Sequence, residues 1–332
     1  MKTYKKAGVN IPAGDELVRR IRDKVRSTFS RGVLADIGAF AAFYDGKFRG
    51  VRQPVLVSSV DGVGTKLKVA FMMKKHDTVG QDLVNHCVND IAVCGAQPLF
   101  FLDYFATGKL SPSITESVVK GMVKACKENS CSLIGGETAE MPGFYHEHEY
   151  DVAGMIVGVA EKKTLFNEKR VKAGDSLIGL PSTGLHTNGY SLARAVLFER
   201  YKVDNYVEEL GTTLGAALLT IHRSYLQAIM TVKHFAETHA FAHITGGGLV
   251  ANVSRVVPKG LTVNIDWQRW ERPAVFKLIQ KCGNVPEDDM RRTFNLGVGL
   301  VIVTSQRGTD KVMDTLRQHG EAPFVIGSVV KK

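Results

Sequence analysis

A carboxylate, two glycines, a hydroxyl and a lysine come together in the short sequence DGVGTK. Asp61 follows a run of apolar residues that predicts a buried strand. Gly62 and Gly64 permit a ligand to approach the backbone closely or permit a positive φ, Thr65 offers a hydroxyl, and Lys66 offers a point charge suited to phosphate. The Walker A spacing G-x-x-x-x-G-K-[ST] is absent. The stretch predicts an anion site with a metal ligand beside it, and the alternative is a tight turn with a solvated lysine.

Three further polar groups recur at intervals of four residues in a predicted helix over residues 79–94. Asp82, His86 and Asp90 share one face of this helix, so carboxylates and the neighbouring amides can converge on a cation. A plain surface helix more often carries lysine and glutamate at such positions. We therefore expect a functional role for Asp90, which lies nearest the helix end.

The segment GGETAE repeats the arrangement found at Asp61. Gly135 and Gly136 predict a backbone turn at a strand end, with Glu137 and Thr138 directly after it. Two strand ends with an acid and a glycine turn, together with the polar helix face in the same half, favour a divalent-metal nucleotide site over three separate coincidences.

The second half contains two more glycine-rich junctions. In PSTGLHTNGYSLAR, backbone amides and hydroxyls gather before a helix predicted to begin near Tyr190, which is a favourable place for phosphate. His186 lies inside that loop, and the alternative is a capping loop with an exposed histidine. In HITGGGLVANV, a strand bearing His243 precedes three glycines and a helix.

Alternating strands and helices must position these groups. Asp103 lies within an apolar strand and therefore needs a hydrogen-bonding or charged partner. A polar linker over residues 161–174 predicts a domain boundary. A helix carrying the two tryptophans is expected after residue 266. The other expected helices are 15–26, 114–129 and 311–319, and the expected strands are 55–59, 99–106, 152–160, 176–180, 262–266 and 324–329.

Composition restricts the class of protein. A chain of 332 residues with 44% hydrophobic residues is long for one core, which suggests two domains. No apolar run approaches the roughly 20 residues that cross a bilayer, and the N-terminus lacks the core of a signal peptide, so a cytoplasmic location is expected. The five cysteines form no C-x-x-C pair or metal-ligand spacing and are expected to be reduced.

The formal net charge of +10 favours anionic partners. One interpretation is nucleic acid, for which a basic face is typical, and the other is a phosphorylated small substrate. Basic residues gather in the first 31 positions, including Lys2, Lys5 and Lys6, but no aromatic-interleaved stripe or nucleic-acid module is present. A solvated arm and helix face explains this gathering equally well, so nucleic acid is not the expected partner.

Long motifs resemble one family. The segments YKKAGVNI, SSVDGVGTKLKVA, HDTVGQDLVNHCVNDIAVCGAQPLFFLDYFATGKL, LIGGETAEMPGFY, DVAGMIVGV, TGLHTNGYSLAR, HITGGGLVANV and MRRTFNLGVG are similar to those of phosphoribosylformylglycinamidine cyclo-ligases, also called AIR synthetases. The resemblance runs nearly end to end and is closer than that to selenophosphate synthetase or thiamine-monophosphate kinase. The sequence also lacks the N-terminal nucleophilic cysteine of the former.

The resemblance implies a reaction and its cofactors. ATP and formylglycinamidine ribonucleotide would give aminoimidazole ribonucleotide, ADP and phosphate through an iminophosphate, with Mg²⁺ present. It implies that the metal and catalytic acids are Asp61, Asp90 and Glu137, with His186 exchanging a proton and His243 in a less defined role. The implied nucleotide contacts are Asp61, Gly62, Val63, Gly64, Thr65, Lys66, Gly135, Gly136, Glu137 and Thr138, and the implied substrate contacts are Thr183, Gly184, Thr187, Asn188, Gly246 and Gly247.

The resemblance also implies an α/β (α+β) two-domain fold and a homodimer. Residues 1–165 would form an ATP-binding domain whose sheet joins that of a second copy, and residues 166–332 a domain with a mixed sheet and helices. The site would lie between the two domains. Two segments depart from the family pattern: SRGVLADIGAFAAFYD is poorer in glycine than expected, and LLTIHRSY carries Ile221 and His222 before Arg223.

Overall fold

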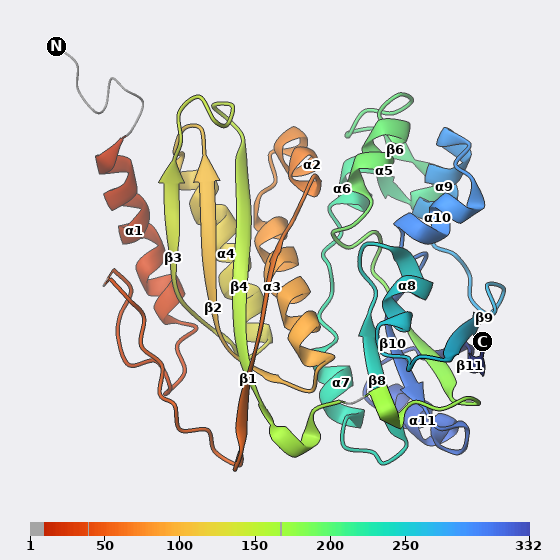
Figure 1. Cartoon of the computed structure of the whole chain (residues 1–332). Coiled ribbons are helices and arrows are strands. Elements are labelled where there is room, and N and C mark those ends of the chain that lie inside the picture. Colours follow the sequence, from red (N-terminus) through yellow and green to blue (C-terminus); the bar gives the residue numbers. More distant parts are fainter. Residues whose placement is uncertain (1–9, 39, 167) are drawn as a thin grey trace. The chain divides into compact units, whose positions relative to one another are not determined.

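The computed structural model describes residues 10–38, 40–166 and 168–332. The chain divides into two compact units (Figure 1). Unit 1 comprises Met1–Ile91 and Gln97–Glu161, and unit 2 comprises Ala92–Ala96 and Lys162–Lys332. Unit 1 thus ends at Glu161, and the domain boundary after residue 165 stays a prediction. Residues 1–9, which include most of the segment YKKAGVNI and the basic residues Lys2, Lys5 and Lys6, lie outside the described residues.

Unit 1 is a four-stranded mixed sheet in the order β1-β4-β2-β3. Strands β2 and β3 are parallel, and the other two pairs are antiparallel. Helices α3 and α4 lie against one face, and α1 lies beside β3 (Figure 1). The element bounds are α1 Ile11–Arg26, β1 Pro54–Gly62, α2 Lys66–Met73, α3 Asp77–Ala92, β2 Gln97–Thr107, α4 Pro112–Glu128, β3 Ser132–Glu140 and β4 Tyr150–Glu161.

Two glycines let α3 and α4 pack backbone to backbone. A Cβ at Gly80 would lie 2.1 Å from the carbonyl oxygen of Val118, and one at Gly121 would lie 2.0 Å from that of Asp77. This close approach buries the polar side of α3 as well as its apolar side, so Asp82 and Asn89 are both inaccessible to solvent. Each buried polar group then needs a partner within the protein.

The other face of the unit 1 sheet, called the open face from here on, is apolar and is covered only in part, by the segment that carries Phe40 and Tyr44. We expected β1 to be a buried strand, but its residues alternate between half-buried and exposed. Leu56 and Val60 are 63% and 66% exposed, and Tyr104 on β2 is also exposed. The prediction was wrong because β1 is an edge strand and only one face of this sheet carries helices.

Unit 2 is built on a five-stranded sheet in the order β8-β10-β5-β11-β9, whose described strand pairs are all antiparallel. The mixed sheet expected here is therefore found in unit 1. A core of Leu177, Leu249, Val301 and Ile326 packs on this sheet. The strands are β5 Ser176–Pro181, β6 Tyr206–Val207, β7 Thr212–Thr213, β8 Thr238–His243, β9 Leu261–Ile265, β10 Val298–Thr304 and β11 Phe324–Lys331.

Three helices of unit 2 were predicted from the sequence, namely the ones observed as α5, α8 and α11, whereas the predicted tryptophan helix is absent from the described residues. Helix α5 begins at Tyr190, as expected. The tryptophans lie in a turn instead of a helix, where Trp267 and Trp270 contact each other and Trp270 Nε1 donates to the carbonyl of Leu296. The helices are α5 Tyr190–Leu197, α6 Leu214–Leu218, α7 Leu226–Val232, α8 Gly248–Ser254, α9 Ala274–Gly283, α10 Glu287–Thr293 and α11 Thr309–Gln318, with 3-10 turns at Lys162–Thr164, Glu168–Arg170, Glu208–Leu210 and Gln306–Gly308.

The helices and the cysteines of the described residues bear on two expectations drawn from composition. No helix of the described residues has both the length and the apolar character that crossing a membrane requires. All five cysteines are free thiols, and four of them are buried.

Candidate active site

Asp61 and Asp90 come together at one edge of the unit 1 sheet. Asp61 lies at the end of β1, and Asp90 lies on α3 and accepts a hydrogen bond from Ser59 Oγ at 3.1 Å. His86, one turn before Asp90, donates from Nε2 to Asp61 Oδ2 at 2.7 Å. The other oxygen of Asp61 accepts the amide of Gly62 at 2.8 Å. Strand and helix thus hold two carboxylates and an imidazole in one group.

Asp61 and His86 stabilise each other's charged form. Burial alone would lower the pKa of His86, but the hydrogen bond and charge of Asp61 outweigh burial and raise that pKa above its ordinary value. Burial likewise works to raise the pKa of Asp61, yet the hydrogen bond and charge of His86 lower it. Asp61 is therefore ionised at neutral pH and is fixed in orientation, as a carboxylate ligand of a hard cation requires.

The turn after β1 has the predicted backbone conformation, but its lysine does not have the predicted role. Gly64 adopts a φ of 63°, which explains the need for glycine there, and Val63 is buried. Lys66, however, is fully buried, and its Nζ lies 2.8 Å from Asp82 Oδ2. A side chain enclosed in this way does not present its ammonium to a phosphate. The structure gives Lys66 a structural partner instead of the expected ligand.

Glu137 does not join the other two acids within one chain. Strands β1 and β3 are the opposite edges of the sheet. Across it, the paired residues are Asp61 on β1, Gly154 on β4, Asp103 on β2 and Gly136 on β3. Three strand spacings amount to about 14 Å, and Glu137, one residue beyond Gly136, points to the other face. The converging set is therefore Asp61, Asp90 and His86.

The glycines before Glu137 serve close packing and not a turn. Residues 135–138 are part of β3. A Cβ at Gly136 would lie 2.3 Å from Asp103 Oδ1 and 2.6 Å from the Asp103 carbonyl oxygen, so only glycine leaves room for this aspartate. The predicted turn at a strand end was wrong, because these glycines lie inside β3 and the group that approaches Gly136 is Asp103.

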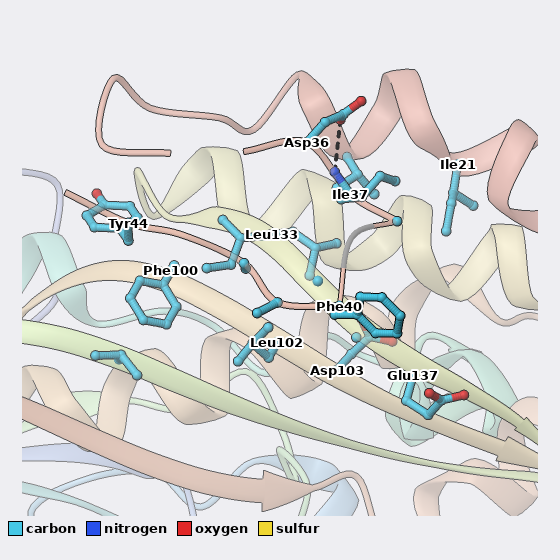
Figure 2. Close-up of a pocket in the computed structure, with 18 of the residues that line it drawn as sticks. Ile21, Asp36, Ile37, Phe40, Tyr44, Phe100, Leu102, Asp103, Leu133 and Glu137 are labelled. Atoms are coloured by element: carbon cyan, nitrogen blue, oxygen red, sulfur yellow. Dashed lines mark hydrogen bonds between the residues drawn. The ribbon is translucent and has the colours of Figure 1, made fainter. Parts of the chain in front are cut away.

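Asp103 lines a cavity of about 960 Å³ in unit 1. Figure 2 shows Phe40 and Tyr44 lying over strand β2, and the Tyr44 and Phe100 rings are 5.2 Å apart between centroids. Glu137 and Thr138 also border this cavity. We expected a charged or hydrogen-bonding partner for Asp103. The partner found within the described residues is its own backbone amide, whose hydrogen bond lowers the pKa of Asp103, but burial outweighs this bond and raises that pKa to about 7.

This pKa makes the stability of unit 1 depend on pH. In the folded state Asp103 keeps its proton up to about pH 7, whereas an unfolded aspartate releases it near pH 4. The unfolded state then binds fewer protons between these values, so this residue lowers stability as pH rises. Asp103→Asn, which cannot ionise, is expected to gain stability relative to wild type from pH 4 to 7.

The measurement is denaturant unfolding of both proteins across that range. Asp204→Asn, at an exposed position, is the matched control and should show no such trend. A constant difference between Asp103→Asn and wild type at every pH would contradict a raised pKa at Asp103.

The predicted loops of unit 2 meet in one place. The amide of Thr183 donates to His186 Nε2 at 3.1 Å, and Thr183 Oγ1 donates to the carbonyl of Ile221. Asn295 binds the carbonyl of Gly184 at 2.8 Å and so ties the loop to the segment before β10. The residues brought together are Thr183, Gly184, His186, Thr187, Asn188, His243 and Gly246, and a Cβ at Gly246 would lie 3.2 Å from Asn188 Oδ1. Gly247 adopts a φ of 96° at the start of α8.

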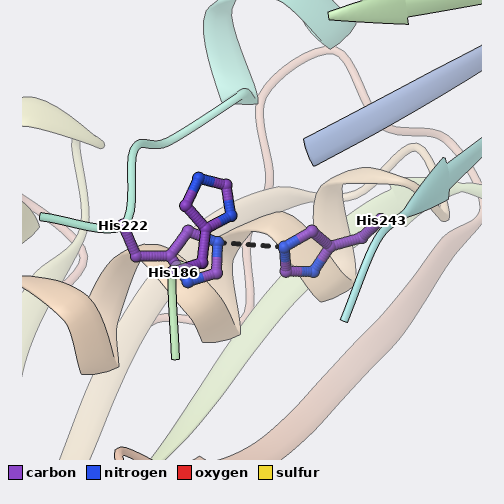
Figure 3. Close-up of side chains that lie close together, drawn as sticks. All are labelled: His186, His222 and His243. Carbon is purple, nitrogen blue, oxygen red and sulfur yellow. Dashed lines mark hydrogen bonds between the residues drawn. The ribbon is translucent and has the colours of Figure 1, made fainter. Parts of the chain in front are cut away.

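Three histidines form the centre of this group (Figure 3). The rings of His186 and His222 stack with centroids 4.0 Å apart, and His222 Nε2 and His243 Nε2 share a hydrogen bond of 3.0 Å. His186 has a φ of 61°, a conformation that is strained for a residue other than glycine and is often found at functional sites. Gly299 leaves space for the cluster, because a Cβ there would lie 2.6 Å from His186 Cε1.

Comparison with known proteins identifies the family. The family models AIR synthase related protein, N-terminal domain, and AIR synthase related protein, C-terminal domain, match residues 46–160 and 172–332. The chain is 49% identical over 330 residues to the phosphoribosylformylglycinamidine cyclo-ligase of Thermoanaerobacter pseudethanolicus, covering 99% of this chain and 97% of that one. It belongs to the phosphoribosylformylglycinamidine cyclo-ligase family.

Solved structures support the fold beyond this cyclo-ligase family. A thiamine-monophosphate kinase from Stenotrophomonas maltophilia superposes with a TM-score of 0.68 at 15% identity, covering 94% of both chains. A hydrogenase maturation protein HypE in complex with ATP superposes with a TM-score of 0.68 at 17% identity, covering 96% of this chain and 86% of that one. At these identities the likeness concerns the fold.

Two residues of this cyclo-ligase family member were not assigned a role from the sequence. His86 was noted on the helix face, and the i, i+4 spacing to Asp90 was the signal that it would join the acids. His222 was noted only as a departure before Arg223, and nothing local to that segment indicates that it stacks on His186.

Proposed function

We propose that the chain catalyses the ATP-dependent ring closure of formylglycinamidine ribonucleotide to aminoimidazole ribonucleotide. The formyl amide oxygen attacks the γ-phosphorus of ATP, and ADP leaves. The amidine nitrogen of the resulting iminophosphate then attacks the activated carbon, and phosphate leaves as the five-membered ring closes. The name of the Thermoanaerobacter relative describes a ligase that cyclises phosphoribosylformylglycinamidine, and the 49% identity of that relative to this chain supports the ring closure.

The observation that carries the proposal is that Asp61 and Asp90 both lie beside His86: Asp61 accepts its hydrogen bond, and a carboxylate oxygen of Asp90 lies within 4.8 Å of one of its ring nitrogens. Carboxylate oxygens are the protein ligands that Mg²⁺ prefers, and Mg²⁺ would neutralise charge on the phosphates of ATP. Asp61, fixed by His86 and by the Gly62 amide, and Asp90, fixed by Ser59, would hold the ion. The ATP complex of HypE on the same fold supports a nucleotide as the ligand. Glu137 and Lys66 take no part in this set.

The loops of unit 2 would act on the ribonucleotide. Thr183, Thr187 and Asn188 offer hydroxyl and amide groups, and Gly184, Gly246 and Gly247 allow the substrate to approach the backbone. Asn188 Nδ2 is buried and has no hydrogen-bond acceptor within the described residues, which is consistent with an acceptor on the substrate. His186 would exchange a proton with the amide or amidine, and His243 supports it through His222.

The test is turnover with defined substrates. Purified protein given formylglycinamidine ribonucleotide, ATP and Mg²⁺ is expected to form aminoimidazole ribonucleotide and ADP in equal amounts. Omitting either the ribonucleotide or Mg²⁺ should stop ADP release. ADP release that requires a different acceptor, such as thiamine monophosphate, with no product from the ribonucleotide, would contradict the proposal.

The proposed enzyme is a homodimer that pairs through the open face of the unit 1 sheet. This face carries Leu56, Val60 and Tyr104 in exposed positions, and exposed apolar side chains on one face of a sheet are typical of an interaction site. A second copy supplies the same surface and so satisfies a two-fold interface.

Charge placed on this face should separate the copies. Leu56→Asp is expected to convert the dimer into a monomer in sedimentation velocity, because dimerisation would bury an unpaired carboxylate. Val250→Asp, at an exposed apolar position of α8 in unit 2, should leave the dimer intact. Equal masses for wild type and Leu56→Asp would show that this face is not the interface.

A further inference from the structure

The three buried histidines of unit 2 have the composition of a transition-metal site. His186, His222 and His243 are almost fully buried and come from three separate segments, the loop before α5, the loop before α7, and strand β8. One ring nitrogen of each lies within 4.8 Å of one ring nitrogen of each of the others. No carboxylate of unit 2 belongs to this group of ligand atoms among the residues that the structure describes. We propose that these imidazoles bind one zinc ion or a similar divalent transition metal.

The distances fit a shared ion. Two nitrogens that bind a tetrahedral Zn²⁺ at about 2.0–2.1 Å lie about 3.3 Å from each other. His222 Nε2 and His243 Nε2 are 3.0 Å apart. The two nitrogens therefore need to move apart by only a few tenths of an ångström for the ion to replace their shared proton. Thr187 Oγ1 lies 3.4 Å from His222 Nδ1 and helps to keep Nε2 directed at His243.

His186 is the ligand that must move. Its ring stacks on His222 at an interplanar angle of 13°, and its Nε2 accepts the amide of Thr183. Rotation about χ2 of a histidine passes through broad wells, so tilting the ring to direct a nitrogen at the ion costs little. Three imidazoles then leave the fourth tetrahedral position for water or a ligand, as in zinc sites with three histidines.

The ligand chemistry separates this site from the one proposed at Asp61 and Asp90. Mg²⁺ takes oxygen ligands and keeps several waters, whereas imidazole suits zinc, copper, nickel and iron. Excess Mg²⁺ therefore fills the carboxylate site without competing for the histidines. A consequence that rests on the proposed function is inhibition, because a bound metal occupies the imidazole assigned to proton exchange.

The test is calorimetric titration of the full-length, chelator-treated protein with Zn²⁺ in excess Mg²⁺ and without nucleotide. Wild type is expected to bind one Zn²⁺ per chain. His222→Gln should bind it at least about tenfold more weakly, since even outer-shell changes cost 10–100-fold in metal affinity. His234→Gln, at an exposed position of unit 2, should bind like wild type.

Two results would overturn the site: no zinc binding by wild type in the micromolar range, or equal zinc affinity in wild type and His222→Gln. Thermal unfolding of His222→Gln shows whether the variant folds. Anomalous diffraction from zinc-soaked wild-type crystals gives a second answer, with a peak among the three imidazoles expected and a peak elsewhere only contradicting the site. Inhibition of turnover by zinc is measured in a separate experiment. If zinc binds to the three histidines without inhibiting turnover, the role of His186 in proton exchange is refuted, but the metal site is not.

Discussion

Asp90→Asn is expected to lower kcat by about 10²–10³-fold, the loss typical when a charge-stabilising group is removed from an active site. The substitution keeps the shape of the side chain, and the amide oxygen still accepts the hydrogen bond of Ser59. What disappears is one of the two negative charges that would hold Mg²⁺ beside the γ-phosphate. The Mg²⁺ concentration needed for half-maximal activity should therefore rise as well.

Asp77→Asn is the matched control for this experiment. It makes the same change on the same helix, at a half-exposed carboxylate that pairs with Lys75 at 3.1 Å. This variant should turn over like wild type. Near-normal activity of Asp90→Asn, measured at limiting Mg²⁺ as well as at saturation, would remove Asp90 from the metal site.

Asp82→Ala is expected to destabilise unit 1 by about 3–5 kcal/mol, because it leaves the buried ammonium of Lys66 without its partner. The pair is fully buried at a distance of 2.8 Å. Burial already lowers the pKa of Lys66, and Asp82 opposes that effect. Without Asp82 the pKa falls further, so the unfolded state binds the proton more tightly and the stability of the variant should rise with pH.

The double replacement Lys66→Met with Asp82→Leu tests what the pair does. An apolar pair of similar volume is expected to be about as stable as wild type or more stable by roughly 1–4 kcal/mol. Denaturant unfolding of the single and double variants measures this. If the double variant is stable but loses ATP affinity, Lys66 contacts the nucleotide after all; retained affinity supports a purely structural role.

Local sequence was sufficient for the parts of the site that depend on periodicity. The helical spacing of His86 and Asp90 placed both on one side of α3, and the glycine pattern before Tyr190 located the start of α5. Asp61 at a strand end followed from the apolar run before it. These features need only contacts a few residues apart.

Features that depend on the order of strands in the sheet or on the burial of helices could not be predicted from local sequence. Glu137 does not lie beside Asp61, because the strands β4 and β2 lie between their strands in the sheet. The sequence does not reveal this order, since β4 is the last of the four strands along the chain. Lys66 looked like a ligand because lysine is rarely buried, and its partner Asp82 lies on another helix. His222 became part of a cluster only through the folding of three distant segments.

The central claim is that Asp61 and Asp90 hold the metal of the nucleotide. A crystal structure of the wild-type protein with Mn²⁺ and a non-hydrolysable ATP analogue tests it most directly, because the anomalous signal of Mn²⁺ locates the ion independently of the nucleotide density. We predict an ion bound by oxygens of Asp61 and Asp90 and by the analogue's phosphates. An ion bound to the phosphates with neither carboxylate in its coordination sphere would contradict the claim.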